Sequence, residues 1–431
     1  MTHRHLSRRL HGLGPSATVA INERSDVLRK QGRPIVKLGL GQSPFPVPTA
    51  VVEALRGNAA AKEYLPVRGL PALREAVADY HRRLTGVPYI ADDVVVGPGS
   101  KELMFLLQVV FDGELIVPTP AWVSYAPQAQ LIGRRVAFLH TRAENGWLLE
   151  PAALDAHLAR EPGLGRVMVL NYPSNPTGQT YDARGLAAIA EVARRHQLLI
   201  LSDEIYGETH HAGAHTSIAA AYPEGTIISS GLSKWCGAGG WRLGTFTAPH
   251  ALGWLLDAIT IAASETYTST SAPIQHAAVT AFRGGIEIER YLWRTRRMLA
   301  GLGRALCERL RRVGIEVLTP AGGFYLFPDF GRHRERLAAA GVLGGDDLAA
   351  RILEEVDVAT LPGSAFGRDP RELTLRIAYV DFDGGRALAA LEARGEPVSS
   401  VVDEAFLASH CAAVLDGVQR IARWIDALPA R

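Results

Sequence analysis

The chain has 431 residues, of which 47% are hydrophobic and 21% are charged, and its formal net charge is +2. This length exceeds what one compact core usually reaches, so we expect two structural units. The composition excludes a disordered or collagen-like chain. The charges are spread without basic blocks, so we expect no nucleic acid as a partner. The longest uncharged run, 115–133, contains three prolines, so we expect no membrane span.

The first residues and the cysteines indicate in which cellular compartment the protein is expected. Residues 1–15 carry basic side chains but no apolar core segment, which predicts a flexible basic arm and not a secretory signal. The three cysteines are far apart: Cys236, Cys307 and Cys411. An odd, sparse set is typical of a reduced protein, and we expect a cytoplasmic location.

Short apolar runs alternate with helical patterns between about residues 90 and 250. The runs are rich in β-branched residues and predict seven strands: 94–96, 114–118, 134–139, 166–171, 198–203, 226–230 and 244–248. The Ala- and Leu-rich segments between them, such as 184–197, predict helices. This pattern indicates an α/β fold in which helices cover both faces of a mostly parallel seven-stranded sheet.

A second, smaller α+β unit is expected beyond a long helix at about 286–313. Its predicted strands are 315–320, 322–327, 358–363 and 373–380. Amphipathic helices over 399–428 would close the chain.

Polar, turn-rich segments follow five of the seven predicted strands. They are GPGSKE (97–102), PTPAW (118–122), NYPSNPTG (171–178), SDEIY (202–206) and SSGLSK (229–234). Ligands of such sheets bind beyond the carboxyl ends of the strands. We therefore expect the functional site at this edge.

Lys234 stands out because lysine is rare in this chain. Only five lysines occur, and only Lys234 follows a predicted strand within a Gly- and Ser-rich turn. A covalent amine nucleophile would have to come from this set. Ser233 adds a hydroxyl, and the planar fork of Arg242 could hold a phosphate or carboxylate. Alone, Lys234 would more simply be a surface lysine.

The turn GPGSKE offers a possible anion site. Gly99, Ser100 and Lys101 stand where a helix is expected to begin. The free N–H groups of a helix start attract anions, and the aligned peptide dipoles strengthen that attraction. The plain alternative is a tight turn with a capping serine.

Four more residues with possible binding roles lie at strand ends. Asp203 ends a predicted strand, and Tyr206 follows one helical turn later. Asn175 precedes a proline in a rigid turn, and Trp122 on a proline-stiffened loop could stack on a planar ring. A helix cap, an Asx turn and core packing are the structural alternatives. Five such segments at successive strand ends nevertheless indicate one site.

As an ordered set, the motifs resemble those of the class I/II aminotransferases, the pyridoxal-phosphate enzymes of the aspartate aminotransferase fold (fold type I). The resemblance covers about residues 16–383. The strings that carry it are GLGQSPFPVP, YLPVRGLPALREAV, GPGSKE, PTPAWVSYAP, NYPSNPTG, SDEIYGE, SKWCGAGGWRLG, GGFYLF, LPGSAFG and LTLRIAY.

The resemblance implies that pyridoxal 5'-phosphate is the cofactor. Lys234 would form a Schiff base with it and, once freed, would act as the base at the substrate Cα. Asp203 would pair with the ring nitrogen, and Trp122 would stack on the ring. Asn175 and Tyr206 would hydrogen-bond the ring oxygen. The phosphate would be held by Gly99, Ser100, Lys101, Ser233 and Arg242, with Ser100 and Lys101 acting chiefly through backbone N–H groups and Tyr64 reaching in from a second subunit.

The resemblance also implies a substrate site and a homodimer with active sites at the interface. Arg376 would clamp the α-carboxylate of an L-amino acid, aided by Asn175 and the backbone around Gly41. The implied parts are the basic arm 1–15, an N-terminal segment of the small domain 16–48, a large cofactor-binding domain 49–295 and a small C-terminal domain 296–431.

The implied reaction is amino transfer from the amino acid to a 2-oxo acid. The alternative is a pyridoxal-phosphate lyase, cyclase or β/γ-replacement enzyme that acts on a substituted amino acid such as S-adenosylmethionine. A non-catalytic regulator would need an N-terminal DNA-binding domain, and too few residues precede Ser16 to build one.

Some positions depart from the family pattern. Gln42 leaves recognition of the substrate side chain open, and Gly231 stands where many relatives have a serine for the phosphate. Trp235 would place a large ring beside the Schiff base and reshape the pocket. We hypothesise that Glu265 reads a cationic part of the substrate across the dimer; a solvated carboxylate is the alternative.

Three histidines follow the SDEIY segment: His210, His211 and His215. Their nearness in sequence to Asp203 and Glu204 could suggest a metal site. Exposed loop histidines are far more common, and the family uses no metal here, so we expect none.

Overall fold

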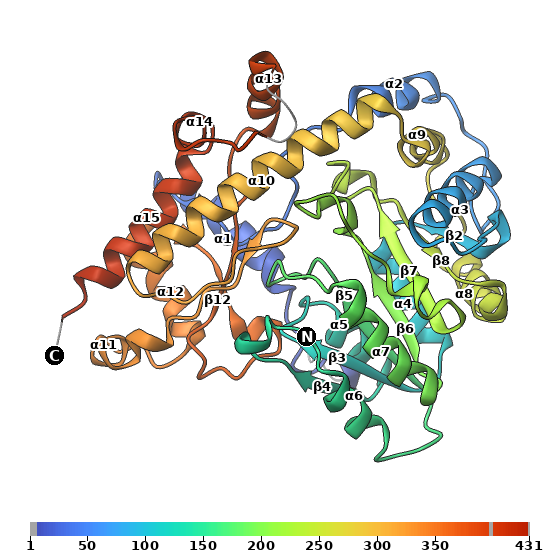
Figure 1. The fold of residues 1–431 in the computed structure, drawn as a ribbon, viewed down its shortest axis with the longest axis horizontal. Coiled ribbons are helices and arrows are strands. Elements are labelled where there is room, and N and C mark those ends of the chain that lie inside the picture. The colour runs from blue at the N-terminus through green and yellow to red at the C-terminus, as the bar shows by residue number, and fades with distance from the viewer. Residues whose placement is uncertain (1–6, 396–399, 430–431) are drawn as a thin grey trace, which may run out of the picture.

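The computed structural model describes residues 7–395 and 400–429. They build a large sheet and, beside it, a group of shorter strands, with the long helix α10 (Ile286–Arg312) running past both (Figure 1). Of the basic arm, residues 1–6 fall outside the described residues. The following residues lie near α5 (Tyr125–Ile132), where the Gln130 side chain donates to His11 O at 3.1 Å.

The large sheet has seven strands in the order β2-β8-β7-β6-β5-β3-β4, and every predicted strand is present. Only β8 runs antiparallel to its neighbours. The strands are β2 (Val94–Gly97), β3 (Glu114–Thr119), β4 (Val136–His140), β5 (Arg166–Asn171), β6 (Leu199–Asp203), β7 (Thr226–Gly231) and β8 (Gly244–Thr247). The predicted α/β class with a mostly parallel sheet is confirmed.

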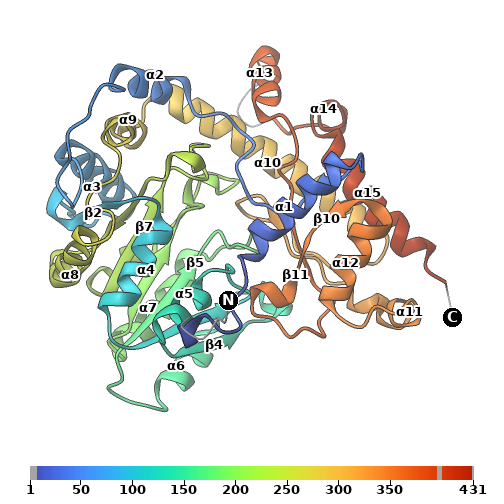
Figure 2. The ribbon, with the colours of Figure 1, turned by 180° about the vertical axis from the view of Figure 1, so that it is seen from behind.

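Helices cover both faces of this sheet (Figures 1 and 2). One face carries α4 (Ser100–Val110), α5 and α8 (Gly253–Ser264). The other carries α3 (Pro71–Thr85), α6 (Pro151–Leu158), α7 (Ala183–Arg195) and α9 (Ala272–Arg283), and α2 (Thr49–Gly57) packs on α9.

The strand β5 shows why the sequence requires two covered faces. Val167 and Val169 lie in the core under α4, whereas Met168 and Leu170 lie in the core under α7. Successive residues of a strand point to opposite faces, so an apolar residue at every position needs helices on both sides.

The shorter strands form two small sheets. In the first, β12 (Leu375–Ala378) lies between β11 (Leu361–Pro362) and β9 (Tyr325–Leu326), antiparallel to both. In the second, β1 (Val36–Lys37) pairs in parallel with β10 (Val358–Ala359). The helices of this region are α1 (Ala17–Lys30), α11 (Arg334–Ala339), α12 (Gly345–Val356), α13 (Gly384–Arg394), α14 (Glu404–His410) and α15 (Ala412–Ala427).

The strand expected at 315–320 is not a regular strand. Only an isolated bridge joins Glu316 to Asp329. Pro320 has no N–H for a ladder. The N–H groups of Ala321 and Gly322 both donate to Gly178 O, which ties this segment to the NYPSNPTG turn instead.

Residues near the N-terminus pack on the small sheets. Arg33 pairs with Asp357 at 2.7 Å, and Arg24 pairs with Glu354 at 2.8 Å. Figure 2 shows α1 beside α12 on this side of the molecule. Within the described ranges, no helix combines the length and the apolar character that a bilayer crossing needs.

Candidate active site

A cavity of about 420 Å³ opens at the carboxyl edge of the large sheet, where the five polar segments meet. Most of the predicted site residues line it: Gly41, Ser100, Lys101, Trp122, Asn175, Asp203, Tyr206, Ser233, Lys234 and Arg242. The prediction that the strand ends converge on one site agrees with this arrangement. The wall also contains Leu40, Gln42, Tyr125, Asn171, Ile205, Gly239 and Gly240.

One end of the cavity is an anion-binding end, built where α4 begins. Gly99 caps this helix with φ +93°, and a Cβ there would collide with the guanidinium of Arg242. Arg242 therefore lies directly against the start of α4. A helix start, an arginine fork and the Ser100 and Ser233 hydroxyls together form a donor set suited to a phosphate.

A row of glycines brings this helix start close to the sheet. Gly97, Gly244 and Gly231 stand side by side in β2, β8 and β7. A Cβ on Gly244 would collide with Ser100 N, and one on Gly231 would lie 2.7 Å from Leu243 O. Gly231 thus lacks the serine hydroxyl of many relatives, and its small size allows the backbone to pack tightly at the anion-binding end.

Asp203 lies on the floor of the cavity and is 3% exposed. The Tyr125 hydroxyl donates to its Oδ2 at 2.5 Å, and Ile205 N donates to Oδ1 at 3.4 Å. Burial raises the pKa of Asp203 to about 6, although these hydrogen bonds and the Lys234 charge oppose the rise. Such a carboxylate favours a cationic partner.

Tyr125 was not among the site residues predicted from the sequence, although it lies in the family-like motif PTPAWVSYAP. Its ring packs edge-on against Trp122 at 5.3 Å between centroids. Tyr125 is the first residue of α5 and stands three positions after Trp122, so its place in the same motif was the available signal.

Lys234 points its amine at the cavity wall, where Nζ donates to Gly41 O at 2.8 Å. Burial, together with the charges of Arg376 and Arg242, lowers the pKa of Lys234 to about 8, although Asp203 opposes the change. A substantial fraction of this amine is therefore neutral near pH 8, which nucleophilic attack and proton abstraction both require.

Tyr206 lies beside Tyr325, another residue that the sequence did not single out. Their hydroxyl groups share a hydrogen bond of 2.7 Å. A Cβ on Gly41 would collide with the Tyr325 hydroxyl, so only glycine fits there. Tyr325 thus connects the backbone at Gly41 to Tyr206. It belongs to the motif GGFYLF, which was the available sign in the sequence.

Arg376 lies behind the cavity wall with no exposed surface. Nη1 donates to Asn175 Oδ1 at 3.4 Å, and Nη2 donates to Gly39 O. The guanidinium also lies 5.0 Å from the Tyr325 ring centroid. Burial lowers the pKa of Arg376, and among the described residues no carboxylate pairs with it.

Three of the singled-out residues lie outside the cavity of their own chain. Tyr64 is 88% exposed, and Glu265 is exposed just after α8. Trp235 is buried against Phe282, with ring centroids 6.3 Å apart. The expectation that the Trp235 ring reshapes the pocket is therefore wrong for this chain: Trp235 lines a different cavity, with Phe282 and Ile288, and is absent from the wall around Lys234.

The three histidines have separate partners. His211 places its two ring nitrogens 3.0 Å from Pro320 O and Gly323 O. His215 contacts Glu204 at 2.9 Å, and His210 Nδ1 lies 3.2 Å from Ala214 N. Within the described part of the chain, no three side chains gather as a possible metal site.

These groups fit pyridoxal phosphate at each of its parts. The anion end suits the phosphate, and the buried Asp203 suits a protonated ring nitrogen. Trp122 and Ile205 in the wall offer flat and apolar surfaces to a ring, and Lys234 supplies the amine. When bound, the cofactor supplies an electron sink for a bond broken at the substrate Cα.

Comparisons with known proteins agree with this donor set. The family described as Aminotransferase class I and II matches residues 33–389. The aspartate aminotransferase of Geobacillus stearothermophilus is 35% identical over 384 residues, 87% of this chain and 94% of that relative. The aspartate/prephenate aminotransferase of Thermus thermophilus is 34% identical over 367 residues, 80% of this chain and 92% of that relative.

A solved structure, aspartate aminotransferase from Thermus thermophilus with maleate, matches with a TM-score of 0.82 at 29% identity, covering 97% of this chain and 99% of that one. These relatives are named as aminotransferases, so a lyase, cyclase or replacement enzyme is not favoured. The chain belongs to the class I and II aminotransferases and is a pyridoxal-phosphate-dependent aminotransferase.

Proposed function

We propose that this enzyme transfers the amino group of a dicarboxylic amino acid, aspartate, to a 2-oxo acid. The observation that carries the proposal is Lys101, whose side chain lines the cavity. Among the described residues it pairs with no carboxylate, and its Nζ lies 5.4 Å from the Trp122 ring centroid.

The charge balance of the cavity supports an anionic side chain on the substrate. Lys101, Lys234 and Arg242 bring three basic groups to the wall, whereas Asp203 is the acidic residue among the wall residues. The cofactor phosphate would occupy Arg242 and the start of α4. Burial and the nearby Arg242 lower the pKa of Lys101. Both effects make an ammonium without a partner unfavourable, so an anion beside Lys101 would stabilise it and be stabilised in turn.

The names of the relatives point the same way. Several are called aspartate aminotransferases, including those of Geobacillus stearothermophilus and Bacillus subtilis. The matched Thermus thermophilus structure contains maleate, which is a dicarboxylate.

The roles of the site residues follow from their places. Lys234 would hold the cofactor and later move the proton at the substrate Cα. Asp203 would hold the ring nitrogen protonated, and Asn175 and Tyr206 would bind the ring oxygen. Trp122 would stack on the ring. Gly99, Ser100, Ser233 and Arg242 would surround the phosphate, and Lys101 would contribute its backbone N–H there, which leaves its side chain for the substrate.

Arg376 would receive the α-carboxylate of the substrate, with Gly41 and Asn175 beside it. Arg376 is covered by Asn175 and Tyr325, so these side chains must shift slightly for direct contact. An arginine fork without an acidic partner is a strong site for a carboxylate. The amine and the α-carboxylate of one amino acid would then be held between Lys234 and Arg376.

We also propose a cytoplasmic homodimer. A tyrosine as exposed as Tyr64 is unusual for an isolated subunit, and at a dimer interface it could reach the partner's phosphate. Glu265, also exposed, keeps its proposed role across the dimer. The three cysteines are free and buried, as a reducing compartment allows. We keep the division into 1–15, 16–48, 49–295 and 296–431, supported by the contacts of α1 with the small sheets.

The experiment is to compare Lys101→Gln with wild type on aspartate and on alanine, with a 2-oxo acid as acceptor. Loss of one charged hydrogen bond should lower kcat/KM for aspartate about 10- to 100-fold and change alanine turnover little. Lys62→Gln is the matched control, because Lys62 is 81% exposed and pairs with Glu63. Equal losses on both substrates, or a wild type that prefers alanine, would contradict the proposal.

A further inference from the structure

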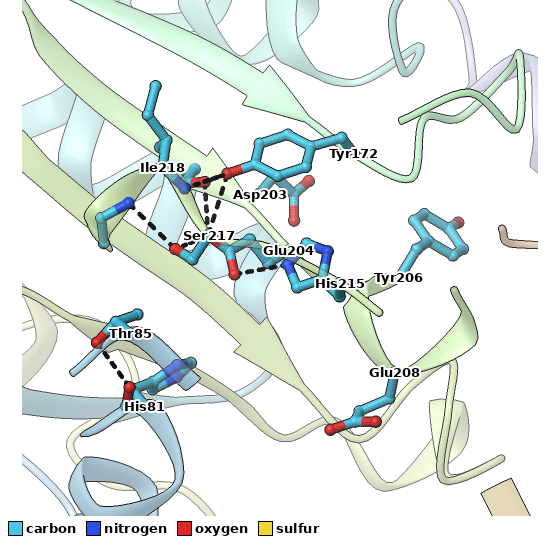
Figure 3. Close-up of polar contacts among 12 residues, drawn as sticks. His81, Thr85, Tyr172, Asp203, Glu204, Tyr206, Glu208, His215, Ser217 and Ile218 are labelled. Carbon is cyan, nitrogen blue, oxygen red and sulfur yellow. Dashed lines mark hydrogen bonds and ion pairs between the residues drawn. The ribbon is translucent and has the colours of Figure 1, made fainter. Parts of the chain in front are cut away.

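Glu204 follows Asp203 directly, but the two carboxylates occupy different places. Asp203 faces the cavity, and Glu204 lies behind it among Tyr172, His215 and Ser217 (Figure 3). The Glu204 side chain is 3% exposed. Burying two adjacent carboxylates costs free energy unless each has hydrogen-bonding or charged partners. The partners of Glu204 therefore need to be identified.

Four side chains donate to Glu204. Oε1 accepts from Ser217 Oγ at 2.5 Å, from Ser202 Oγ at 2.8 Å and from the Tyr172 hydroxyl at 3.4 Å. Oε2 accepts from His215 Nε2 at 2.9 Å. We call these four side chains the Glu204 cage. Ser202 belongs to β6, Tyr172 comes directly after β5, and His215 and Ser217 lie in the 215–218 segment, so the cage ties the end of β6 to two neighbours.

The cage favours an ionised carboxylate, because the hydroxyl groups of Ser217, Ser202 and Tyr172 all donate to it. Burial opposes ionisation, yet the His215 contact and the serine hydroxyls hold the pKa of Glu204 below its usual value. Tyr172 also accepts from Ile218 N at 2.8 Å, which fixes its hydroxyl proton toward Glu204 and Ser202. Glu204 is thus a fixed negative charge.

Other titratable groups face this region. His81 on α3 is buried with both ring nitrogens unpartnered, and burial lowers its pKa to about 4, so it is neutral at pH 7. Tyr89 is buried, and burial raises its pKa well beyond its usual value. Neither adds charge near neutral pH. The negative charge behind Asp203 is therefore that of Glu204.

The charge of Glu204 acts on Asp203. After burial, which is the largest influence, Glu204 is among the groups that raise the pKa of Asp203. A second negative charge behind Asp203 favours a proton that is held between Asp203 and a ring nitrogen.

We propose that Glu204, held by its cage, is a positioning residue for Asp203: it fixes the end of β6 and keeps a second negative charge behind the carboxylate that binds the cofactor ring. The proposal rests on the proposed role of Asp203. Glu204 itself touches neither cofactor nor substrate.

The test uses Glu204→Gln, which keeps the shape and removes the charge. Two measurements apply: the pH midpoint of the visible absorption transition of the bound cofactor, and the dissociation constant of pyridoxal phosphate from the apoprotein, followed by tryptophan fluorescence. Loss of a nearby negative charge disfavours the protonated cofactor, so the midpoint should fall by roughly half a pH unit. The dissociation constant should rise about threefold or more.

Glu208→Gln is the matched control. Glu208 lies on the same segment, but it pairs with Arg296 and accepts from the Tyr80 hydroxyl at 2.6 Å, away from Asp203. This variant should keep the wild-type midpoint. Equal midpoints and dissociation constants for the two variants would overturn the proposal.

Two further variants keep the result decisive. If Glu204→Gln does not fold, Ser217→Ala removes one cage donor and should shift the midpoint in the same direction by less; no shift would overturn the proposal. Asp203→Asn separates this inference from the proposed function. If that variant binds the cofactor as wild type does, the role of Asp203 is wrong; if only Asp203→Asn has an effect, Glu204 has no part.

Discussion

The two ends of the active site are built differently. The cofactor end uses the large sheet: Asp203 ends β6 and Lys234 follows β7, and neighbouring parallel strands bring such ends together. The substrate end uses distant segments, since Gly41 and Arg376 come from opposite ends of the chain. Sheet topology therefore places the first end, whereas packing between the large and small sheets places the second.

The difference has a functional meaning. Changes at the cofactor end should abolish cofactor binding or the reaction itself. Changes at the substrate end should alter the affinity for amino acids and leave the cofactor in place.

The largest effect is expected for Lys234→Ala. This variant lacks both the amine that holds the cofactor and the base at the substrate Cα, so kcat should fall by about a thousandfold or more. Borohydride reduction followed by mass spectrometry should no longer fix cofactor to this segment. Lys62→Ala serves as the control, and a covalent adduct at another lysine would contradict the assignment.

Arg376→Lys should affect only the substrate end of the active site. A lysine keeps the charge but loses the planar fork, so KM for the amino acid should rise about 10-fold or more. The dissociation constant of the cofactor should stay within about twofold of the wild-type value. If the cofactor is lost as well, the two ends are not independent and the comparison fails.

Asp203→Asn should stabilise the apoprotein. The pKa of Asp203 is raised from 3.8 to about 6, so the native state binds the proton more tightly than the unfolded state does. The carboxylate therefore destabilises the fold as pH rises through this window, by about 1 to 3 kcal/mol above pH 6.

Thermal unfolding of the two apoproteins measures this effect. The Asn variant should melt higher at pH 7.5, and the difference should shrink as the pH falls below 3.8, where the wild-type carboxyl becomes protonated in both states. Equal melting temperatures at both pH values would show that Asp203 is not strained by burial. Cofactor affinity of the Asn variant should fall at the same time.

The smallest effect is expected for Tyr325→Phe, at the junction of the two ends. It removes the hydroxyl partner of Tyr206, a loss of about 1 kcal/mol. The expected result is a five- to tenfold weaker binding of amino acid or cofactor, measured by titration of the visible spectrum. A variant indistinguishable from wild type would show that Tyr206 needs no support from Tyr325.

The sequence predicted the strands of the large sheet and the segments that meet at its edge. It could do so because an unbroken apolar run such as 166–171 has few uses other than a strand buried on both faces. Lys234 and Asp203 were found because each follows such a run. Their functional roles came from resemblance and remain proposals.

Side-chain partners could not be predicted in the same way. Tyr125 reaches Asp203 across 78 positions, and Tyr325 reaches Tyr206 across 119. No local pattern encodes such pairs, because they depend on how separate elements pack. The pocket role expected for Trp235 was wrong for the same reason. The segment 315–320 forms only an isolated bridge, Pro320 has no N–H for a ladder, and the two residues after it bind Gly178 O.

The buried guanidinium of Arg376 has a consequence for the working enzyme. A cation enclosed by aromatic rings and carbonyl groups, and lacking an acidic neighbour among the described residues, attracts carboxylic acids with little regard to their chemistry. Metabolites and buffers such as acetate or succinate would compete with the amino acid for it. The effective rate would then depend on the total pool of organic acids around the protein, and assays in different buffers would rank the same substrates differently.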